Sequence, residues 1–173
     1  MEEYGQIDTV VHCAGISPNT PFFDQTAEEW EKVFSTNMIG SFNVTQTALR
    51  IMKALGHLPD RNIVLIGSTN GINSNDPQSA HYDSSKAGVN LLANTVAKLY
   101  QETGVRVNAV APGWIDTGMN RTLEPEYRDA EMKRIHMRRF ARPSEVASSI
   151  AYLASEDASY VNGAVHMVDG GYN

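Results

Sequence analysis

The sequence predicts an α/β domain in which a parallel sheet of four strands is covered by helices on both faces. Short runs of β-branched and apolar residues alternate along the chain with segments of helical periodicity, an order typical of parallel sheets. Each run is apolar at consecutive positions, as expected of a strand buried on both faces. No internal repeat, low-complexity block or linker divides the 173 residues. Residues 1–173 are therefore expected to form one domain.

The four expected strands each end at a turn. Strands are predicted from the runs TVVHC, NIVLIG, VRVNAVA and AVHMV, at residues 9–13, 62–67, 105–111 and 164–168. Turn-forming residues follow each run, in the loops 14–18, 68–71 and 112–117 and in the tail after Val168. Ligands of open parallel sheets bind beyond the carboxyl ends of the strands, so these loops are expected to line a site.

Apolar residues at helical spacing predict helices between the strands, at residues 27–37, 39–55, 82–103 and 144–155. Thr26 is expected to cap the first helix, with Glu29 completing a capping box, and Ser144 is expected to cap the last. Gly104 suits the end of the third helix. Residues 117–142 are polar, rich in methionine and poorly patterned, and are expected to form a mobile flap.

The composition argues against several classes of protein. The formal charge is −6, from 14 Lys and Arg against 20 Asp and Glu. This acidic balance, together with the absence of a run of Lys or Arg in the sequence, argues against a nucleic-acid partner. No stretch approaches the roughly 18 consecutive apolar residues of a membrane span, and the N-terminus is acidic, so neither a transmembrane nor a secretory segment is expected. With Cys13 as its single cysteine, the chain is expected to be cytoplasmic. The five histidines lie too far apart for a helical metal pair, and no metal site is expected.

Tyr82 and Lys86 are the residues that point to a reaction. They lie four residues apart at the start of a predicted helix, so they share one of its faces. A phenol has a pKa of about 10, and a cation within about 4–6 Å lowers that pKa by roughly 1–3 units. The pair therefore suits general acid/base chemistry at a carbonyl or an alcohol. On spacing alone, a tyrosine four residues before a lysine is more often a surface pair of an amphipathic helix. The position after the Ser68 loop favours catalysis, and none of the other six tyrosines has a lysine at that offset.

These residues carry a resemblance to the short-chain dehydrogenases/reductases. The family's motifs occur in order as CAG at 13–15, NMIG at 37–40, GSTNG at 67–71, YDSSK at 82–86, NAVAPGWIDT at 108–117 and VDGG at 168–171. Residues 141–163 resemble the bacterial branch that includes the acyl-carrier-protein ketoreductases and the sugar-alcohol dehydrogenases. The chain looks like the C-terminal two-thirds or so of a family member. The resemblance implies a Rossmann-like three-layer parallel sheet, truncated to the C-terminal four strands with flanking helices.

The resemblance also implies an NAD(P)-dependent oxidoreductase that interconverts a carbonyl and a secondary alcohol. Tyr82 would exchange a proton with the substrate oxygen, and Lys86 would lower the pKa of Tyr82 and bind the nicotinamide ribose. Ser68 would hold the substrate carbonyl by a hydrogen bond. Thr69 is an alternative to Ser68, because the loop looks one residue longer than usual, although the glycine that follows favours Ser68. Asn37 would interrupt its helix and hold a water that relays protons to Lys86, and an ordinary helix C-cap at this position is compatible with that role.

The implied cofactor is NAD or NADP, and the sequence does not distinguish between them. The implied cofactor contacts are Ala14, Gly15, Tyr82, Lys86, Pro112, Gly113, Ile115 and Thr117. A Pro-Gly pair after a strand is by itself only a turn, so the contacts after residue 111 depend on the resemblance.

The sequence departs from the family pattern in two places. His12 and Cys13 stand where the family has two asparagines, and Cys13 is expected to be a small buried residue rather than a reactive thiol. No G-x-G-x-x-G is present, nor the residue that would choose NAD or NADP. Binding of the dinucleotide by this chain alone is therefore expected to be weak. The strand at 9–13 is expected to be an open apolar edge, which a complementing N-terminal fragment, a symmetry mate or a rearranged terminus would cover.

The expected partners are a small-molecule carbonyl or alcohol substrate and further copies of this chain, with no nucleic acid and no membrane. The resemblance implies a homodimer or homotetramer formed through the helices at 39–55 and 82–103. The alternative function is that of a catalytically inactive family member that only folds and oligomerises. A hydrolase based on Ser68 is a weaker alternative, because neither His81 nor His136 has an evident orienting acid in the sequence.

Overall fold

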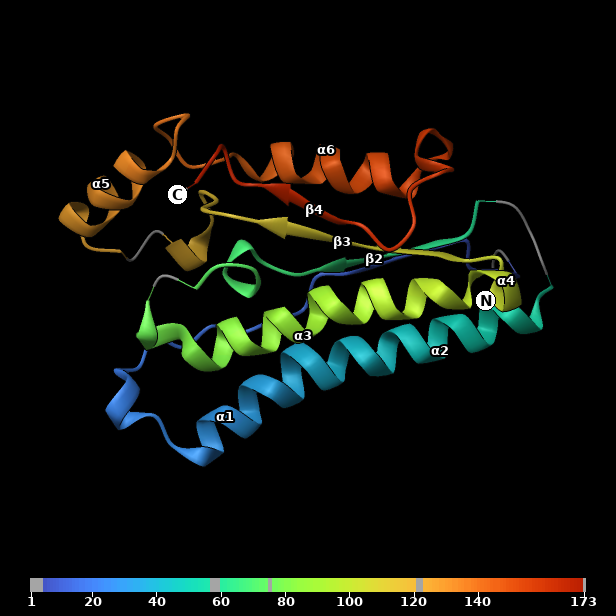
Figure 1. Ribbon diagram of the computed structural model, residues 1–173, viewed down its shortest axis with the longest axis horizontal. Helices are drawn as coiled ribbons and strands as arrows, with labels where there is room; N and C mark the ends of the chain where they lie inside the picture. The colour runs from blue at the N-terminus through green and yellow to red at the C-terminus, as the bar shows by residue number, and fades with distance from the viewer. Residues whose placement is uncertain (1–4, 57–59, 75, 121–122, 173) are drawn as a thin grey trace.

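The computed structural model describes residues 5–56, 60–74, 76–120 and 123–172, apart from the side chain of residue 119. The parallel sheet consists of β1 (Thr9–His12), β2 (Asn62–Ile66), β3 (Arg106–Pro112) and β4 (Val165–Val168), in the order β1-β2-β3-β4. All four carboxyl ends therefore lie at the same end of the sheet (Figure 1). The predicted strands and their parallel pairing are confirmed.

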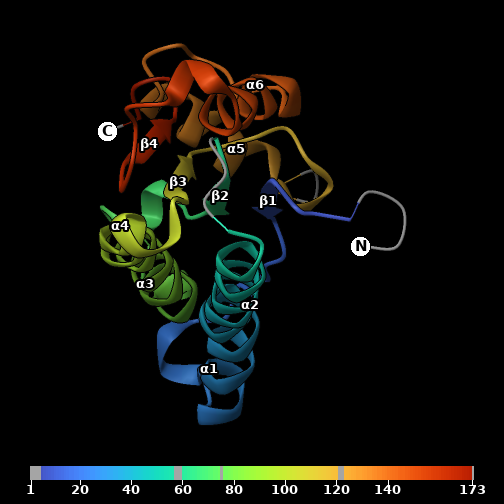
Figure 2. The same cartoon turned by 90° about the vertical axis from the view of Figure 1, so that its right-hand side faces the viewer.

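Helices cover both faces of this sheet, so the fold has three layers (Figure 2). On one face lie α2 (Gly40–Ala54) and α3 (Ala80–Val96), and on the other lies α6 (Pro143–Ala154). The resulting Rossmann-like arrangement confirms the predicted fold class.

Alternate side chains of each central strand enter two different cores. In β2, Ile63 and Leu65 pack with α2 and α3, whereas Val64 packs with α6, and all three are fully buried. Burying an aliphatic side chain of this kind contributes about 1.5–3 kcal/mol. Because both faces of the sheet are covered, the strand is apolar at consecutive positions, which is the pattern that predicted it.

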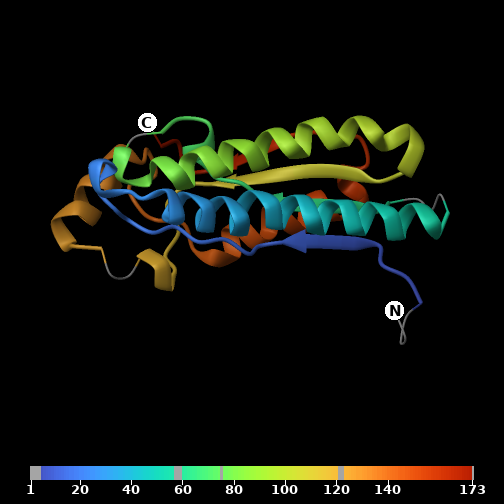
Figure 3. The same ribbon diagram turned by 90° about the horizontal axis from the view of Figure 1, so that it is seen from below.

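One long helical rod lies beside α3 (Figure 3). It consists of α1 (Ala27–Phe34), a π-helical turn over Ser35–Ile39, and α2. Thr26 caps α1 as predicted, its side chain accepting a hydrogen bond from the backbone N–H of Glu29 at 3.2 Å. The interruption expected near Asn37 is a π turn, a feature that often marks functional sites.

The helix predicted at 82–103 begins two residues earlier and consists of α3, a short 3-10 turn and α4 (Tyr100–Thr103). It ends at Gly104, which has a φ of 66°. A residue in this left-handed conformation is favoured as glycine, because glycine has no Cβ to clash. The carboxyl end of α4 is therefore fixed next to the start of β3.

The last third of the chain contains one helix that was not predicted and one whose cap differs from the predicted residue. Within the predicted flap, residues 125–134 form the helix α5 (Pro125–Arg134). The cap of α6 is Arg142 rather than Ser144, because the helix already begins at Pro143, whose fixed φ suits a first helical position. The Glu145 carboxylate accepts a hydrogen bond from the backbone N–H of Arg142 at 2.7 Å, and this bond closes the first turn.

The outer strand β1 lies at the edge of the sheet that the described residues form (Figure 2). Val11 in this strand is 40% exposed, in agreement with the expected open edge. Cys13 follows the strand and is exposed, so the prediction of a buried cysteine was wrong. Its apolar neighbours in sequence belong to an edge strand rather than to an interior one. Among the described residues, no helix is long and apolar enough to span a bilayer.

Candidate active site

The loops after β2 and β3 meet the start of α3 at the carboxyl end of the sheet (Figure 1). Ser68 follows β2, and Tyr82 lies in the first turn of α3. The Ser68 hydroxyl hydrogen bonds to the Tyr82 side chain, an interaction that favours the phenolate form. Ser68 Oγ also accepts a hydrogen bond from the backbone N–H of Asn70 at 3.1 Å, which fixes its orientation. The structure therefore brings these two predicted residues together.

The neighbouring hydroxyl of Thr69 lies elsewhere. It donates to the carbonyl oxygen of Pro112 at 3.2 Å and so joins the loop after β2 to the end of β3. Of the two alternatives that the sequence left open, Ser68 is the one that contacts Tyr82. His81 lies next to Tyr82 in sequence, but its Nδ1 faces the backbone N–H of Tyr82 at 2.8 Å. Its Nε2 lies 3.8 Å from the Glu29 carboxylate, an acidic neighbour that the sequence had not indicated.

Lys86 lies one turn after Tyr82 on α3. Its Nζ is 5.8 Å from the centre of the Tyr82 ring and donates a hydrogen bond of 2.6 Å to the carbonyl oxygen of Ile66. Burial lowers the pKa of Lys86 to about 8, with nearby Cys13 opposing this effect. The predicted sharing of one helix face by Tyr82 and Lys86 agrees with this geometry.

The pKa of Tyr82 is raised, whereas the sequence predicted that Lys86 would lower it. Burial raises its pKa above the ordinary value, the hydrogen bond from Ser68 opposes that rise, and the charge of Asp83 adds to it. The ammonium of Lys86 bonds to the Ile66 carbonyl and is not among these influences. In this structure the desolvation of the phenol therefore outweighs any attraction from the lysine.

Asn37 lies in the π turn, is fully buried, and connects the loop after β1 to α3. Its Oδ1 accepts from the backbone N–H of Ile16 at 2.8 Å, and its Nδ2 donates to the Ile16 carbonyl at 3.0 Å and to Ser85 Oγ at 2.9 Å. Ser85 Oγ in turn donates to the Tyr82 carbonyl at 2.7 Å. Sequence reasoning missed Ser85, although its position three residues after Tyr82 places it within reach of that carbonyl.

The loop after β1 approaches these side chains closely at Gly15. A Cβ at this position would lie 3.3 Å from Lys86 Nζ and 3.4 Å from Asn37 Oδ1. Such contacts are tighter than ordinary van der Waals contacts, so a side chain here would press on both groups. The absence of a side chain at Gly15 therefore lets the loop after β1 lie close against Lys86 and Asn37.

The loop after β3 holds the other predicted cofactor contacts. The backbone N–H of Gly113 donates to the Val168 carbonyl at 3.1 Å, and a Cβ on Gly113 would lie 2.9 Å from the Cβ of Asp169. The backbone N–H of Thr117 donates to the Ile115 carbonyl at 2.9 Å, and Ile115 forms an isolated parallel bridge with Ala141. These contacts hold the loop beside the end of β4, and the bond from Thr69 to the Pro112 carbonyl joins it to the Ser68 loop.

Helix α5 is attached to this loop through Glu131, which is 6% exposed. Its Oε2 accepts a hydrogen bond from Trp114 Nε1 at 2.9 Å and another from the Tyr172 hydroxyl, and its Oε1 lies 3.2 Å from Arg134. The Trp114 ring stacks on Phe140, with ring centres 5.3 Å apart. The polar sequence of α5 gave no sign of this buried carboxylate.

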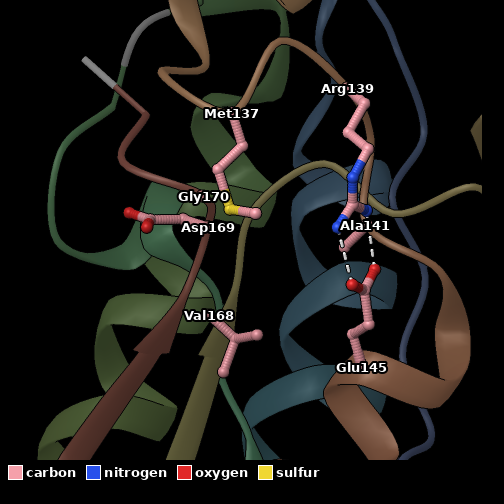
Figure 4. A pocket seen from close by; sticks show the side chains of 7 residues that line it. All are labelled: Met137, Arg139, Ala141, Glu145, Val168, Asp169 and Gly170. Atoms are coloured by element: carbon pink, nitrogen blue, oxygen red, sulfur yellow. Dashed lines mark hydrogen bonds and ion pairs between the residues drawn. The ribbon is translucent and has the colours of Figure 1, made fainter.

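A cavity of about 120 Å³ lies at the carboxyl end of β4 (Figure 4). On one side Met137 and Asp169 line it, and on the other the Arg139 guanidinium forms an ion pair with the Glu145 carboxylate at 2.6 Å (Figure 4). None of the predicted catalytic residues lines this cavity. It is therefore separate from the cluster around Tyr82.

The predicted site residues do not all lie in one place. Ser68, Tyr82, Lys86 and Asn37 form one connected group, with Gly15 beside it, and Gly113, Ile115 and Thr117 lie in the adjoining loop. His12, which stands at a departure from the family pattern, has a buried Nε2 with no hydrogen-bond partner among the described residues. Burial and the charge of Lys86 both lower the pKa of His12, so it lies close to the same group.

A three-layer parallel sheet with polar side chains gathered at its carboxyl end places the chain among the open α/β proteins whose ligands bind at that end. A family model described as enoyl-(acyl carrier protein) reductase matches residues 1–173. The chain belongs to the short-chain dehydrogenase/reductase family of oxidoreductases, in the branch that holds 3-oxoacyl-[acyl-carrier-protein] reductases.

Two curated relatives illustrate the range of this branch. The chain is 40% identical over 173 residues to the 3-oxoacyl-[acyl-carrier-protein] reductase FabG of Thermotoga maritima, covering 99% of this chain and 68% of that protein. It is 36% identical over 178 residues to glucose 1-dehydrogenase 2 of Bacillus subtilis, covering 99% of this chain and 66% of that protein. The family and the oxidoreductase class that the sequence predicted are confirmed.

Solved structures agree with this assignment. The crystal structure of gox2181 matches with a TM-score of 0.91 at 38% identity, covering 98% of this chain and 66% of that one. A 3-oxoacyl-[acyl-carrier protein] reductase from Brucella melitensis matches with a TM-score of 0.88 at 31% identity, covering 95% and 62%. The chain thus spans about two-thirds of the length of the relatives it matches.

Proposed function

We propose that this chain carries the reaction centre of an NAD(P)-dependent oxidoreductase that interconverts a carbonyl and a secondary alcohol, with Tyr82 as the acid/base. The observation that carries the proposal is the connected group of Ser68, Tyr82, Lys86 and Asn37 at the carboxyl end of the sheet. Folding alone does not require a buried lysine next to a buried tyrosine, because an ammonium is disfavoured away from water.

In this mechanism the Ser68 hydroxyl donates a hydrogen bond to the substrate oxygen and Tyr82 exchanges a proton with it. A bound nicotinamide supplies or accepts the hydride. Burial raises the pKa of Tyr82, so the phenol stays protonated and can act as the acid when a carbonyl is reduced. Lys86, with a pKa lowered to about 8, gives up a proton more readily than an ordinary lysine and can return one towards Tyr82. Asn37 would hold the water of this relay.

The residues around Gly15 and Gly113 fit the nicotinamide end of a dinucleotide. Gly15 lies close against Lys86, and the loop after β3 offers the backbone groups of Pro112 and Gly113 and the side chains of Ile115 and Thr117. With Ala14, Tyr82 and Lys86, these residues would hold NAD or NADP. The sequence has no G-x-G-x-x-G whose amides would bind the pyrophosphate, so we expect weak affinity from this chain alone.

The proposed substrate is a small molecule with a carbonyl or secondary alcohol group. The names of the relatives include 3-oxoacyl-[acyl-carrier-protein] reductase and glucose 1-dehydrogenase, so an acyl thioester and a sugar are the first two classes to test. We propose a cytoplasmic location, with neither a nucleic-acid nor a membrane partner.

We further propose a homodimer or homotetramer formed through α2 and α3. These helices expose Phe42 at 40% and Leu91 at 65%, which is consistent with a covered face in an assembly. The open edge of β1 offers unpaired backbone groups to a complementing fragment. That edge also favours a second candidate function, an inactive family member that folds and oligomerises without turnover.

The test is to assay the purified chain with NADH or NADPH and a 3-oxoacyl thioester, and with NAD or NADP and a sugar, beside Tyr82→Phe. The proposal predicts turnover that falls by at least about 100-fold in Tyr82→Phe, while the thermal midpoint is kept. Activity that survives this change would remove Tyr82 from the proton transfer. Nicotinamide fluorescence that shows no binding at about 1 mM cofactor would favour the inactive alternative.

A further inference from the structure

The loop between β2 and α3 lies directly on α3, with backbone against helix at two points (Figure 1). A Cβ on Gly67 would lie 1.8 Å from Asn90 Oδ1, and a Cβ on Gly71 would lie 2.5 Å from the backbone nitrogen of Ala87. Neither position has room for a side chain. Ser68 lies between these two glycines, so its backbone is held close to the helix on both sides.

Asn90 holds the start of this loop. Its side chain is 5% exposed, and its Nδ2 donates a hydrogen bond of 3.1 Å to the carbonyl oxygen of Ser68. Its Oδ1 is buried and has no hydrogen-bond partner among the described residues. A buried acceptor without a partner is unfavourable, so the burial of this amide carries a cost. What it supplies is the bond to the Ser68 carbonyl.

Asp83 holds the far end of the same loop. It is 4% exposed, and its carboxylate accepts one hydrogen bond from Asn70 Nδ2 at 2.9 Å and another from Ser74 Oγ at 2.5 Å. Hydrogen bonds to a charged acceptor are stronger than those between neutral groups. The loop is thus attached to α3 at Ser68, through Asn90, and again at Asn70 and Ser74, through Asp83.

We propose that Asn90 and Asp83 are positioning residues that fix the Ser68 hydroxyl relative to the Tyr82 hydroxyl, an inference that rests on the function proposed above. Tyr82, Lys86 and Asn90 follow one another at intervals of four residues and so share one stripe of α3. A single helix therefore carries the acid/base, the lysine and the anchors of the serine loop. Ser68 is thereby attached to the helix that carries Tyr82 as well as to the end of β2.

A spectroscopic test decides the proposal without requiring turnover. The isotope-labelled hydroxyl-bearing ring carbon of Tyr82 is assigned by its loss in Tyr82→Phe, and its NMR shift is compared in the full chain and its variants. Ser68→Ala gives the reference NMR shift of a Tyr82 phenol that has no interaction with the Ser68 hydroxyl. We expect Asn90→Ala to move the signal in the same direction, and the double variant to match Ser68→Ala alone, because the two changes remove one interaction.

The matched control is Asn94→Ala. Asn94 lies one turn further along α3, and its Nδ2 donates to the Gly163 carbonyl at 3.1 Å, away from the serine loop. We expect this variant to leave the Tyr82 signal at its wild-type position. An unchanged signal in Asn90→Ala, or an equal movement in Asn94→Ala, would overturn the proposal. Should Asn90→Ala not fold, Asn70→Ala takes its place, since it removes a hydrogen bond to the Asp83 carboxylate without changing the charge beside Tyr82.

Kinetics separate this inference from the proposed function. In a preparation that turns over, Asn90→Ala is expected to lower kcat about tenfold with little change in KM, because misplacement of a reacting group acts on the chemical step. In the Ser68→Ala background, Asn90→Ala should lower kcat no further. A rise in KM at unchanged kcat would contradict a positioning role. If the wild-type chain shows no turnover, the proposed reaction fails, and the Tyr82 signal still decides whether Asn90 positions Ser68.

Discussion

Lys86 Nζ donates a hydrogen bond to the carbonyl oxygen of Ile66 at 2.6 Å, and this bond joins the helix that carries Tyr82 to the last residue of β2. The lysine is 4% exposed, and its burial lowers the pKa of the ammonium from 10.5 to about 8. A neutral carbonyl compensates only part of the hydration that the charge loses. The folded chain therefore holds this proton less tightly than the unfolded chain does.

This relationship predicts how stability depends on pH. Between pH 8 and 10.5 the unfolded chain binds more protons at Lys86 than the folded chain, so the contribution of this residue to the free energy of unfolding rises with pH. The two pKa values correspond to about 3 kcal/mol across that window. Urea denaturation should show wild type gaining about this amount relative to Lys86→Met, in which the titrating group is absent.

The control for this prediction is Lys98→Met, since Lys98 is exposed at the end of the same helical segment. Its free energy of unfolding should run parallel to that of wild type over the same range of pH. A difference between wild type and Lys86→Met that stays constant from pH 8 to 10.5 would mean that the ammonium is not buried as described.

Ser85 provides a second prediction, because its hydroxyl links Asn37 to the Tyr82 carbonyl. Ser85→Ala leaves the buried Nδ2 of Asn37 without that acceptor and should lower the free energy of unfolding by about 1–3 kcal/mol. The amide of Ile16, which donates to Asn37 Oδ1 at 2.8 Å, should then exchange its hydrogen faster.

Ser41→Ala is the matched control, since Ser41 is also buried and its hydroxyl donates to the backbone carbonyl of Asn37 at 2.6 Å. It removes a serine hydroxyl from the same neighbourhood while leaving the Asn37 side chain in place. Hydrogen exchange at Ile16 should stay at the wild-type rate in this variant. Equal acceleration in both variants would show that Ser85 has no particular role in holding Asn37.

The sheet could be predicted from the sequence because its physical cause is local. Residues 63–66 are apolar at consecutive positions since both faces of β2 are covered, and the same is true of residues 109–111 in β3. The choice between Ser68 and Thr69 could not be made in this way. Ser68 adopts an extended backbone with φ −165°, which turns its hydroxyl towards Tyr82 and that of Thr69 towards Pro112. Composition and spacing do not determine that direction.

Other features depend on distant parts of the chain. Helix α5 has a polar sequence, and the contacts that place it join Glu131 to Trp114 and Tyr172, which lie 17 and 41 residues away. The acidity of Tyr82 was expected to follow from its distance to Lys86, whereas the burial of the phenol dominates. Burial is a property of the assembled fold, so a helical spacing alone predicts the neighbours of Tyr82 but not the direction of its pKa shift.

The exposure of Cys13 predicts that a thiol reagent labels the folded chain. Without denaturant, one thiol per chain should react at a rate within about tenfold of that in urea, and Cys13→Ser should not react. Under the proposed function, saturating NADPH or NADH should slow the labelling, because Cys13 directly precedes Ala14 and Gly15. Labelling that occurs only after unfolding would contradict the exposed position.

Glu131 carries the last prediction, because one carboxylate oxygen accepts hydrogen bonds from both Trp114 and Tyr172. In Glu131→Gln the side chain keeps its size but has a single acceptor oxygen, and its NH₂ group faces a donor. The free energy of unfolding should fall by about 1–3 kcal/mol, and the emission of Trp114 should shift towards that of a solvated indole. Trp30→Phe serves as the background, so that Trp114 is the only tryptophan observed.

Two further variants separate the carboxylate from its neighbours. Glu126→Gln changes an exposed carboxylate on the same helix and should leave both stability and emission within error of the background. Tyr172→Phe removes one of the two donors and should have a smaller effect than Glu131→Gln, since the bond from Trp114 Nε1 at 2.9 Å remains. If Glu131→Gln instead behaves like Glu126→Gln, α5 is held by the stacking of Trp114 on Phe140 rather than by the buried carboxylate.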